Sequence, residues 1–141
     1  MRAVADSSFL VALFYPPDVH HGEAVKHFEE LETVYVHHDL LKEALTVLMY
    51  RFDVEMVKEI YEKVTGSDAF VVSYFGLEDV TGFWLNLGRR ISYFDAVGIL
   101  LALKLGSSLL TFDKEQRRVY ERIMSAAGVE KYPRNSPRRS L

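Results

Sequence analysis

The chain has 141 residues, of which 49% are hydrophobic and 26% are charged, and this is the composition of an ordinary globular protein with one core. It contains no cysteine, which excludes disulfides and thiolate metal sites and suits a reducing compartment such as the cytosol. No apolar run approaches the roughly 20 residues of a membrane span, so we expect a cytoplasmic protein with no membrane partner.

The net charge of −3 is unevenly distributed along the chain. Residues 1–112 carry 16 acidic and 9 basic side chains, whereas residues 113–141 carry 4 acidic and 8 basic ones. This distribution allows an acidic, metal-binding pocket beside a surface that attracts phosphates. The simpler interpretation is a solvated surface that ends in a charged tail.

Short apolar runs alternate with helical patterns along the chain. The runs predict strands at residues 2–5, 33–37, 69–74 and 108–112, with a last short strand at 129–132. The intervening patterns predict helices at about 9–15, 19–31, 40–52, 54–64, 78–87, 94–105 and 114–127. Asp18, Asp39 and Asp53 are expected to cap the second, third and fourth of these helices.

Strands that alternate with helices predict parallel pairing and right-handed crossovers. The expected fold is therefore α/β, a three-layer α/β/α sandwich around a central parallel sheet of four to five strands. Residues 1–132 are predicted to form this single domain. Residues 133–141 are polar and rich in proline and arginine, and are predicted to be a disordered tail.

The stretch 91–113 (ISYFDAVGILLALKLGSSLLTFD) carries an acid near each end of a helix–strand unit. Asp95 opens a helix that is apolar on all sides, where a carboxylate must be hydrogen-bonded, paired or bound to metal. Asp113 follows a strand, at the sheet edge where ligands gather in open α/β folds. Capping explains both acids as well: Ser92 and Asp95 fit a capping box, and Asp113 fits an N-cap with Gln116 as its partner.

Two further acids have related positions. Asp6 directly follows the first strand, and Glu43 lies at the edge of the apolar face of its helix, where a glutamate that reaches out to solvent is the alternative explanation. Four carboxylates in one pocket would repel one another without a cation, and Mg²⁺ and Mn²⁺ prefer oxygen ligands of this kind. Capping does not explain why the four elements should converge.

The ordered set of segments 6–10 (DSSFL), the helix around Glu43, 94–96 (FDA) and 110–113 (LTFD) resembles the four motifs of the PIN-domain ribonucleases. In its single-domain size the chain is most similar to the VapC toxins of toxin–antitoxin pairs. The resemblance implies a metal-dependent endoribonuclease that uses Mg²⁺ or Mn²⁺ to hydrolyse RNA, with a cognate antitoxin. By motif match, the metal-binding and catalytic residues are Asp6, Glu43, Asp95 and Asp113, and the residues that support them by hydrogen bonding are Ser8 and Thr111.

Other parts of the chain offer weaker signals. Basic residues that could contact the RNA substrate are Arg89, Arg90, Arg117 and Arg118, although a solvated face explains them equally well. Phe83, Trp84 and Leu87 have helical spacing and offer an apolar surface for a homodimer, although such a set is more often core. The adjacent pairs His20-His21 and His37-His38 cannot face one way on a helix or a strand, so structural or surface roles are expected for them.

Three alternatives remain open from the sequence. The chain could be an RNA-processing nuclease outside a toxin–antitoxin pair, or a binding module that keeps the scaffold without catalysis, although the presence of all four acids argues against the module. A phosphotransfer domain is the third alternative. A dehalogenase-like phosphatase needs an aspartate where Ser8 stands, and a response-regulator receiver needs paired acids where Ser7 follows Asp6.

Overall fold

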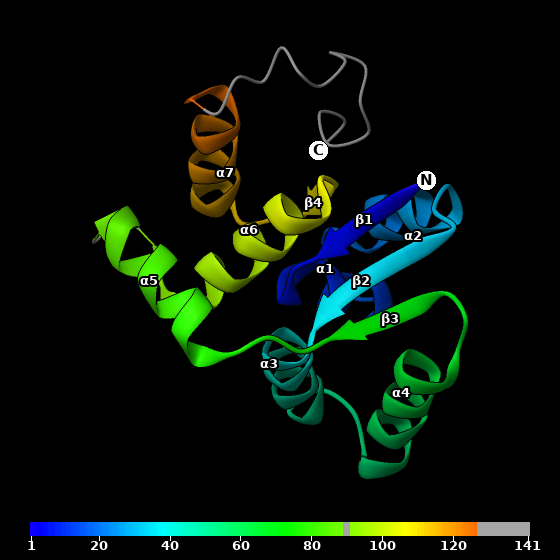
Figure 1. Cartoon of the computed structure of the whole chain (residues 1–141). Coiled ribbons are helices and arrows are strands. Elements are labelled where there is room, and N and C mark those ends of the chain that lie inside the picture. Colours follow the sequence, from blue (N-terminus) through cyan, green and yellow to red (C-terminus); the bar gives the residue numbers. More distant parts are fainter. Residues whose placement is uncertain (89–90, 127–141) are drawn as a thin grey trace.

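Four parallel strands form one sheet in the order β3-β2-β1-β4 (Figure 1). The structure is a computed structural model and describes residues 1–88 and 91–126. The strands are β1 (Arg2–Ala5), β2 (Thr33–His37), β3 (Phe70–Ser73) and β4 (Ser108–Leu110). Because successive side chains of a strand point to opposite faces, Ala3 and Ala5 of β1 enter one core and Val4 enters the other.

The seven described helices cover both faces of the sheet. They are α1 (Ser7–Phe14), α2 (His21–Glu29), α3 (His38–Met49), α4 (Val54–Gly66), α5 (Leu77–Leu87), α6 (Tyr93–Leu105) and α7 (Lys114–Ala126). Side chains of α1, α2, α3 and α4 build one core, and those of α5, α6 and α7 build the other, so α4 and α5 lie far apart in Figure 1. The chain is therefore an α/β/α sandwich, as the alternation of strands and helices predicts.

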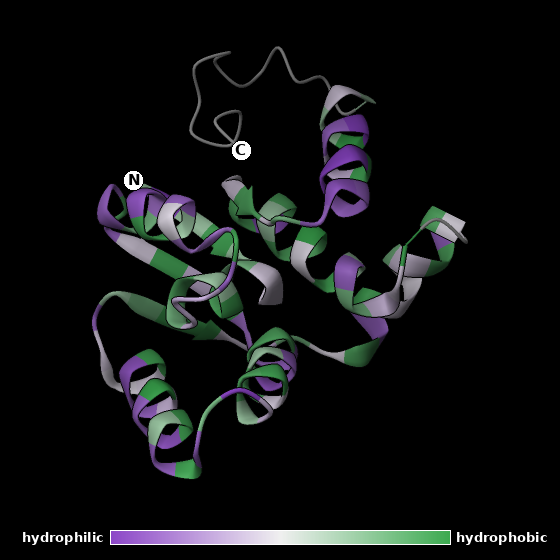
Figure 2. Ribbon diagram, turned by 180° about the vertical axis from the view of Figure 1, so that it is seen from behind, coloured by the Kyte–Doolittle hydropathy of each residue, from purple (hydrophilic) through white to green (hydrophobic). Residues whose placement is uncertain are grey.

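Helix α6 is the most buried helix of the fold, and α7 covers its outer side. Ala96, Val97, Gly98, Ile99, Leu101 and Ala102 of α6 are all buried, whereas α7 buries one face only. In Figure 2 the ribbon of α7 is largely purple, and that of α6 is largely green or white. Gly106 ends α6 in the left-handed conformation (φ 60°, ψ 36°), where a residue without a side chain is favoured.

Most predicted element boundaries agree with the structure to within about two residues, and three details differ. Asp18 does not cap α2, because the N-cap of that helix is His20 and Asp18 Oδ1 accepts from the His20 N–H before the helix begins. The predicted strand at 108–112 ends at Leu110, because Ser8 accepts a hydrogen bond from the main-chain N–H of Phe112 and draws the chain away from the sheet. Asp39 does not cap α3, since the helix begins at His38, two residues earlier than predicted, and His37 Nδ1 accepts from the Asp39 N–H. The predicted strand at 129–132 and the tail at 133–141 lie outside the described residues.

The order of the strands decides where a ligand can bind. The chain adds β2 and β3 on one side of β1 and then returns to place β4 on the other side. In open parallel sheets, ligands bind outside the carboxyl ends of the strands, where the direction of winding reverses. Here that place lies beyond the ends of β1 and β4. None of the described helices is long and apolar enough to cross a membrane.

Candidate active site

Asp6 stands just beyond β1, at the point where β1 and β4 end together. The register pairs Ala5 with Leu110, so Asp6 lies beside Thr111. The Asp6 carboxylate is 3% exposed and accepts hydrogen bonds from the Ser8 N–H (3.2 Å), the Ser8 hydroxyl (3.1 Å), the Thr111 hydroxyl (3.4 Å) and the Gln116 amide (3.2 Å). These donors hold a buried carboxylate in one orientation without neutralising its charge.

Glu43 reaches the same region from α3. Its side chain is half-buried, and the Ser7 hydroxyl donates a short hydrogen bond to Oε1. Ser7 is the first residue of α1, directly after Asp6, and α1 packs against α3. The edge position predicted for Glu43 is confirmed, and Ser7 is the residue that directs its carboxylate toward the end of β1.

Asp95 lies in the first turn of α6, and its side chain is half-buried. The predicted cap is present, because the Ser92 hydroxyl accepts from the Asp95 N–H at 3.1 Å. This bond uses the main chain of Asp95, and the Asp95 carboxylate, which also has a hydrogen bond with Ser92, still lies near the charges of the other acids. Capping and membership of an acidic pocket are therefore compatible at this residue.

Asp113 has both predicted roles at once. Its Oδ1 accepts from the main-chain N–H groups of Glu115 (2.9 Å) and Gln116 (3.1 Å), which makes it the cap of α7. The predicted partnership with the Gln116 side chain is wrong. That amide points inward to Asp6 and to the Asp95 carbonyl, and Thr111 instead accepts from the Asp113 N–H at 3.0 Å.

The electrostatics show that the four carboxyl groups share one region. The pKa of Asp95 is raised to about 6, first by burial and then by the negative charges of Asp6, Asp113 and Glu43, against a hydrogen bond with Ser92. Burial is also the main cause that raises the pKa of Asp6, to which the charge of Glu43 adds. The structure thus brings together the four acids singled out from the sequence.

No basic side chain that the structure describes forms an ion pair with this acidic group. Among residues 1–88 and 91–126, the ion pairs involve Glu32, Asp39 and Glu115 and none of the four acids. The group offers only oxygen donors, which are the ligands that Mg²⁺ and Mn²⁺ prefer. A bound divalent cation would relieve the mutual repulsion, and the donor type suits such an ion. Among the described residues, however, the ligand atoms that already lie close enough together for an ion are those of His37, His38 and Asp39.

Two hollows adjoin Glu43, and both are lined by Glu43 and Val47. The first, which we call the Asp113 hollow, has about 430 Å³ and is lined by Ser7, Ser8, Val11, Asp18, His20, Glu43, Val47, Phe112 and Asp113. The second, the Phe94 hollow, has about 360 Å³ and is lined by Asp39, Lys42, Glu43, Thr46, Val47 and Phe94.

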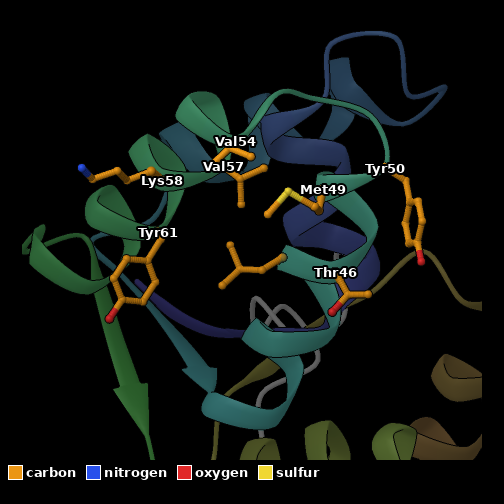
Figure 3. Close-up of a pocket in the computed structure, with 8 residues that line it drawn as sticks. Thr46, Met49, Tyr50, Val54, Val57, Lys58 and Tyr61 are labelled. Carbon is orange, nitrogen blue, oxygen red and sulfur yellow. The ribbon is translucent and has the colours of Figure 1, made fainter.

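A third depression lies away from the acids, between α3 and α4 (Figure 3). It has about 650 Å³ and is lined almost wholly by apolar and aromatic side chains, with Lys58 as its one charged group. Figure 3 shows Met49 and Val57 near its centre, with Tyr50 and Tyr61 on opposite sides. Because none of the four acids lines this groove, it is not the place of acid-dependent chemistry.

The supporting residues include two that the sequence patterns do not identify as such. Ser8 and Thr111 bond to Asp6 as expected, and Ser8 also fixes Phe112. Ser7 and Gln116 are the additions. Gln116 is completely buried, and its Nε2 donates to Asp6 Oδ1 and to the Asp95 carbonyl at 3.0 Å. The sequence signal for this role is that Gln116 is a polar residue on the apolar face of α7.

The basic residues predicted to bind substrate have other partners where the structure describes them. Arg117 donates a short hydrogen bond to the Thr111 carbonyl, and Arg118 pairs with Glu115 at 2.9 Å on the exposed side of α7. Neither lines the two hollows beside the acids. Arg89 and Arg90 lie outside the described residues.

The surface predicted for a homodimer is partly used within the chain. Phe83, Trp84 and Leu87 are half-buried and pack against the core beneath α6 and α7, and the Trp84 indole donates to the Ile91 carbonyl at 3.1 Å. On the same helix, Leu77 and Leu85 are the apolar side chains left exposed, at 72% and 66%.

Of the two adjacent histidine pairs, His37-His38 brings its rings together at the junction of β2 and α3, contrary to the expectation for a regular helix or strand. The rings of His37 and His38 lie 4.5 Å apart, and His38 stacks on Tyr74 at 4.8 Å. With Asp39 they place three potential metal-ligand atoms within 4.8 Å of one another. His37 is fully buried and caps α3, which is a structural role.

Comparisons with known proteins agree with this architecture. The model of the PIN domain family matches residues 3–122. The crystal structure of VapC20 from Mycobacterium tuberculosis, a toxin that cleaves the sarcin-ricin loop, is similar with a TM-score of 0.71 and 22% identity over 89% of this chain and 95% of that one. PAE2754 from Pyrobaculum aerophilum is similar with a TM-score of 0.60 and 19% identity over 92% and 96%.

A search of curated protein sequences finds no match. The two solved structures share the fold of the chain over nearly their whole length, and the residues matched by the family model include Asp6, Glu43, Asp95 and Asp113. The chain therefore belongs to the PIN domain family.

Proposed function

We propose that the protein is an endoribonuclease that depends on Mg²⁺ or Mn²⁺. The observation that carries this proposal is the group of four acids at the carboxyl edge of the sheet, whose charges no described basic side chain balances. Membership of the PIN family supports a nuclease. The residues that would hold the cation are Asp6, Glu43, Asp95 and Asp113.

The reaction proposed is hydrolysis of an RNA phosphodiester. A water oxygen forms a bond to phosphorus, the bond to the leaving ribose oxygen breaks, and that oxygen takes up a proton. A bound divalent cation supplies charge stabilisation and lowers the pKa of the attacking water. The side chains of the protein hold the carboxylates in position. Ser8, Thr111 and Gln116 orient Asp6, and Ser7 orients Glu43.

The test is cleavage of RNA by the purified protein with Mg²⁺, with Mn²⁺ and with a chelator. Internal cleavage that requires the metal is the expected result. Turnover of a phosphomonoester without RNA cleavage would favour the phosphotransfer alternative instead. A protein that binds RNA but cuts it under none of these conditions would support the non-catalytic module.

We further propose that the protein is the toxin of a type II toxin–antitoxin pair, with a cognate antitoxin as its partner. The similarity of its fold to VapC20, a toxin that cleaves the sarcin-ricin loop, supports this proposal. Expression of the chain should arrest growth, and co-expression of a small protein encoded beside it should restore growth. Growth without arrest, from a protein that cleaves RNA in vitro, would favour an RNA-processing nuclease.

A homodimer is proposed as the working assembly. Helix α5 exposes Leu77 and Leu85, and the groove between α3 and α4 exposes Tyr50 and Tyr61, so two apolar surfaces are available. Light scattering at micromolar concentration should give twice the mass of the chain. A clean monomer would contradict the dimer without affecting the proposed chemistry.

A further inference from the structure

We infer that His37, His38 and Asp39 bind a transition-metal ion of the zinc type, at a site separate from the four acids. The three residues follow one another where β2 ends and α3 begins. Two imidazole nitrogens and a carboxylate form a different donor set from that of the acidic group, which offers oxygen alone. The inference does not rest on the proposed nuclease function, and it adds a second ion of different chemistry.

The spacing of the ligand atoms is the first support for this site. Nδ1 of His38 lies 3.5 Å from Asp39 Oδ1, and Nδ1 of His37 lies 3.8 Å from Asp39 Oδ2. One ligand atom from each of the three residues lies within 4.8 Å of the other two. Zn²⁺ holds imidazole nitrogen and carboxylate oxygen in tetrahedral geometry, which places neighbouring ligands roughly 3.4 Å apart. The three ligand atoms therefore lie close to the spacing that a single ion requires.

Aromatic side chains hold both imidazole rings in place. His38 is stacked on Tyr74, with ring centres 4.8 Å apart, and His37 meets Phe75 edge-on at 4.3 Å. Both aromatic residues follow β3 directly, and the register pairs His37 with Ser73, the last residue of β3. The ends of two neighbouring strands thus fix the rings beside each other. Ligands that are held in position before an ion binds lose little conformational freedom when it does.

The imidazole of His37 is in the state that a metal ligand needs. It is fully buried, and burial lowers the pKa of His37, so the ring is neutral near pH 7 and keeps a lone pair on one nitrogen. That nitrogen is Nδ1, which accepts from the Asp39 N–H at 3.1 Å. An ion would take the place of this N–H at the lone pair.

The second nitrogen of the His37 ring supports the same role. Nε2 carries the proton when Nδ1 accepts, and among the described residues it has no complete hydrogen bond. An unpaired buried donor is uncommon in proteins and calls for an explanation. Metal-binding histidines ordinarily direct this N–H to a main-chain or carboxylate oxygen, and the main chain of Phe75 favours a proton on this ring. The buried ring therefore has the surroundings of a metal ligand.

The site is open to solvent on the side of His38 and Asp39. Their side chains are 27% and 29% exposed, so an ion can enter, and a fourth coordination position remains for water. Lys42, one turn further along α3, lies 3.6 Å from Asp39 Oδ1 and is 70% exposed. An exposed pair of this kind is weak, and the lysine can turn away when a cation binds. Lys42 therefore opposes the ion only slightly.

The four acids and this site are electrostatically separate. Asp39 is not among the groups that raise the pKa of Asp95. The charged groups that act on the pKa of His37 are its neighbours His38, Asp39 and Lys42, and they include none of the four acids. Mg²⁺ prefers oxygen ligands, whereas imidazole nitrogen suits Zn²⁺, Ni²⁺ and Cu²⁺. An excess of Mg²⁺ should therefore leave this site to the transition metal.

The experiment titrates the untagged full chain with Zn²⁺ in excess Mg²⁺ and measures the dissociation constant by calorimetry. Wild type should bind one Zn²⁺ per chain. His38→Gln and Asp39→Asn should each weaken binding at least about tenfold, because loss of even a supporting group at a metal site typically costs that much. Asp39→Asn keeps the size of the side chain and the main-chain N–H that bonds to His37. Lys42→Met should bind Zn²⁺ more tightly than wild type.

Two control variants locate the ion. His20→Gln removes the exposed member of the other adjacent histidine pair, which lies outside this cluster, and Asp95→Asn alters the acidic group. Both should bind Zn²⁺ as wild type does. Loss of binding in either control, or wild-type binding by both His38→Gln and Asp39→Asn, would overturn the inference. A wild-type protein that binds no Zn²⁺ would overturn it as well.

Spectroscopy identifies the donor atoms directly. Electron paramagnetic resonance of bound Cu²⁺ should show coupling to two imidazole nitrogens in wild type and to one in His38→Gln, and four carboxylates give no such coupling. Zn²⁺ should raise the melting temperature of wild type and of His20→Gln, because an ion that binds only the folded state stabilises it. It should raise that of His38→Gln and Asp39→Asn much less.

Melting curves without added metal show whether each variant is folded. A wild-type spectrum with no nitrogen coupling would refute the site even if an ion binds to the chain. None of these measurements uses RNA, so a protein that cleaves no RNA would end the proposed function and leave this test unchanged.

Discussion

The side-chain amide of Gln116 donates a 3.2 Å hydrogen bond to Oδ1 of Asp6, across 110 residues of sequence. The same amide donates to the main-chain oxygen of Asp95 at 3.0 Å. One fully buried side chain from α7 therefore ties the end of β1 to the start of α6, which are the elements that carry two of the four acids.

Gln116→Met should lower both stability and activity. Methionine has a similar length but donates no hydrogen bond, so the buried Asp6 carboxylate loses a donor, at a cost of about 1–3 kcal/mol. Thermal melts and RNA cleavage check this expectation. Arg118→Met is the control on the same helix, since its exposed pair with Glu115 contributes at most about 1 kcal/mol. Equal melting temperatures for the two variants would contradict the role of Gln116.

Gly98→Ala should disturb the site from inside α6. A Cβ at this position would lie 3.1 Å from the Gln116 amide nitrogen and 3.4 Å from Leu40, so the amide that bonds Asp6 must shift by a few tenths of an ångström. Alanine otherwise favours a helix over glycine by about 1 kcal/mol. We expect activity to fall while stability changes little.

Gly82→Ala in α5 is the control for this substitution, because nothing lies within 4 Å of its added Cβ. It should stabilise the protein and leave activity unchanged. The combination of Gly98→Ala with Gln116→Met should cost less than the sum of the two single changes, because both act through the same amide. Additive losses would show that Gly98→Ala acts through another contact.

Stability of the metal-free protein should fall as the pH rises from about 4 to about 6. The pKa of Asp95 is raised by burial and by its acidic neighbours from its usual 3.8 to about 6. Between these values the folded state keeps a proton that the unfolded state has released, so the free energy of unfolding decreases with pH. Burial raises the pKa of Asp6 in the same direction.

Melting curves in chelator across this pH range test the expectation. The decrease in melting temperature with pH should be smaller in Asp95→Asn, because asparagine does not titrate. It should also be smaller in wild-type protein with Mg²⁺, because the cation offsets the repulsion that favours the protonated form of Asp95. Identical slopes in wild type and Asp95→Asn would show that Asp95 does not carry the effect.

The sequence predicts the sheet and the four acids because both depend on local patterns. The strands after which Asp6 and Asp113 stand are short apolar runs bounded by polar residues, and the edge position of Glu43 follows from helical geometry. The convergence of these acids could be expected because parallel strands end at one edge of a sheet. The N-cap roles of Asp53 and Asp113 are equally local, and both are confirmed.

Other features depend on contacts between distant segments. Gln116 fits a capping pattern with Asp113, and only the packing of α7 on α6 turns its amide toward Asp6. His37 caps α3 in place of Asp39 because β2 continues in extended conformation (φ −74°, ψ 141°) up to the helix. The stack of His20 on Phe112 joins residues that no sequence spacing brings together.

Asp95→Asn tests whether the four acids form a metal-dependent nuclease site. Asparagine keeps the shape of the side chain and leaves the Ser92 cap in place, because that bond uses the Asp95 main-chain N–H. It removes one negative charge from the site proposed to hold the cation. The metal-free variant should therefore melt at a higher temperature than the wild type near pH 7.

The decisive measurement is RNA cleavage by wild type and Asp95→Asn in Mg²⁺ and in Mn²⁺, with thermal melts of both proteins. We predict that the variant folds, melts higher without metal, and loses RNA cleavage by orders of magnitude. A folded Asp95→Asn protein that cleaves RNA at the wild-type rate would contradict the proposed metal site. Asp95 would then have only a structural role in the first turn of α6.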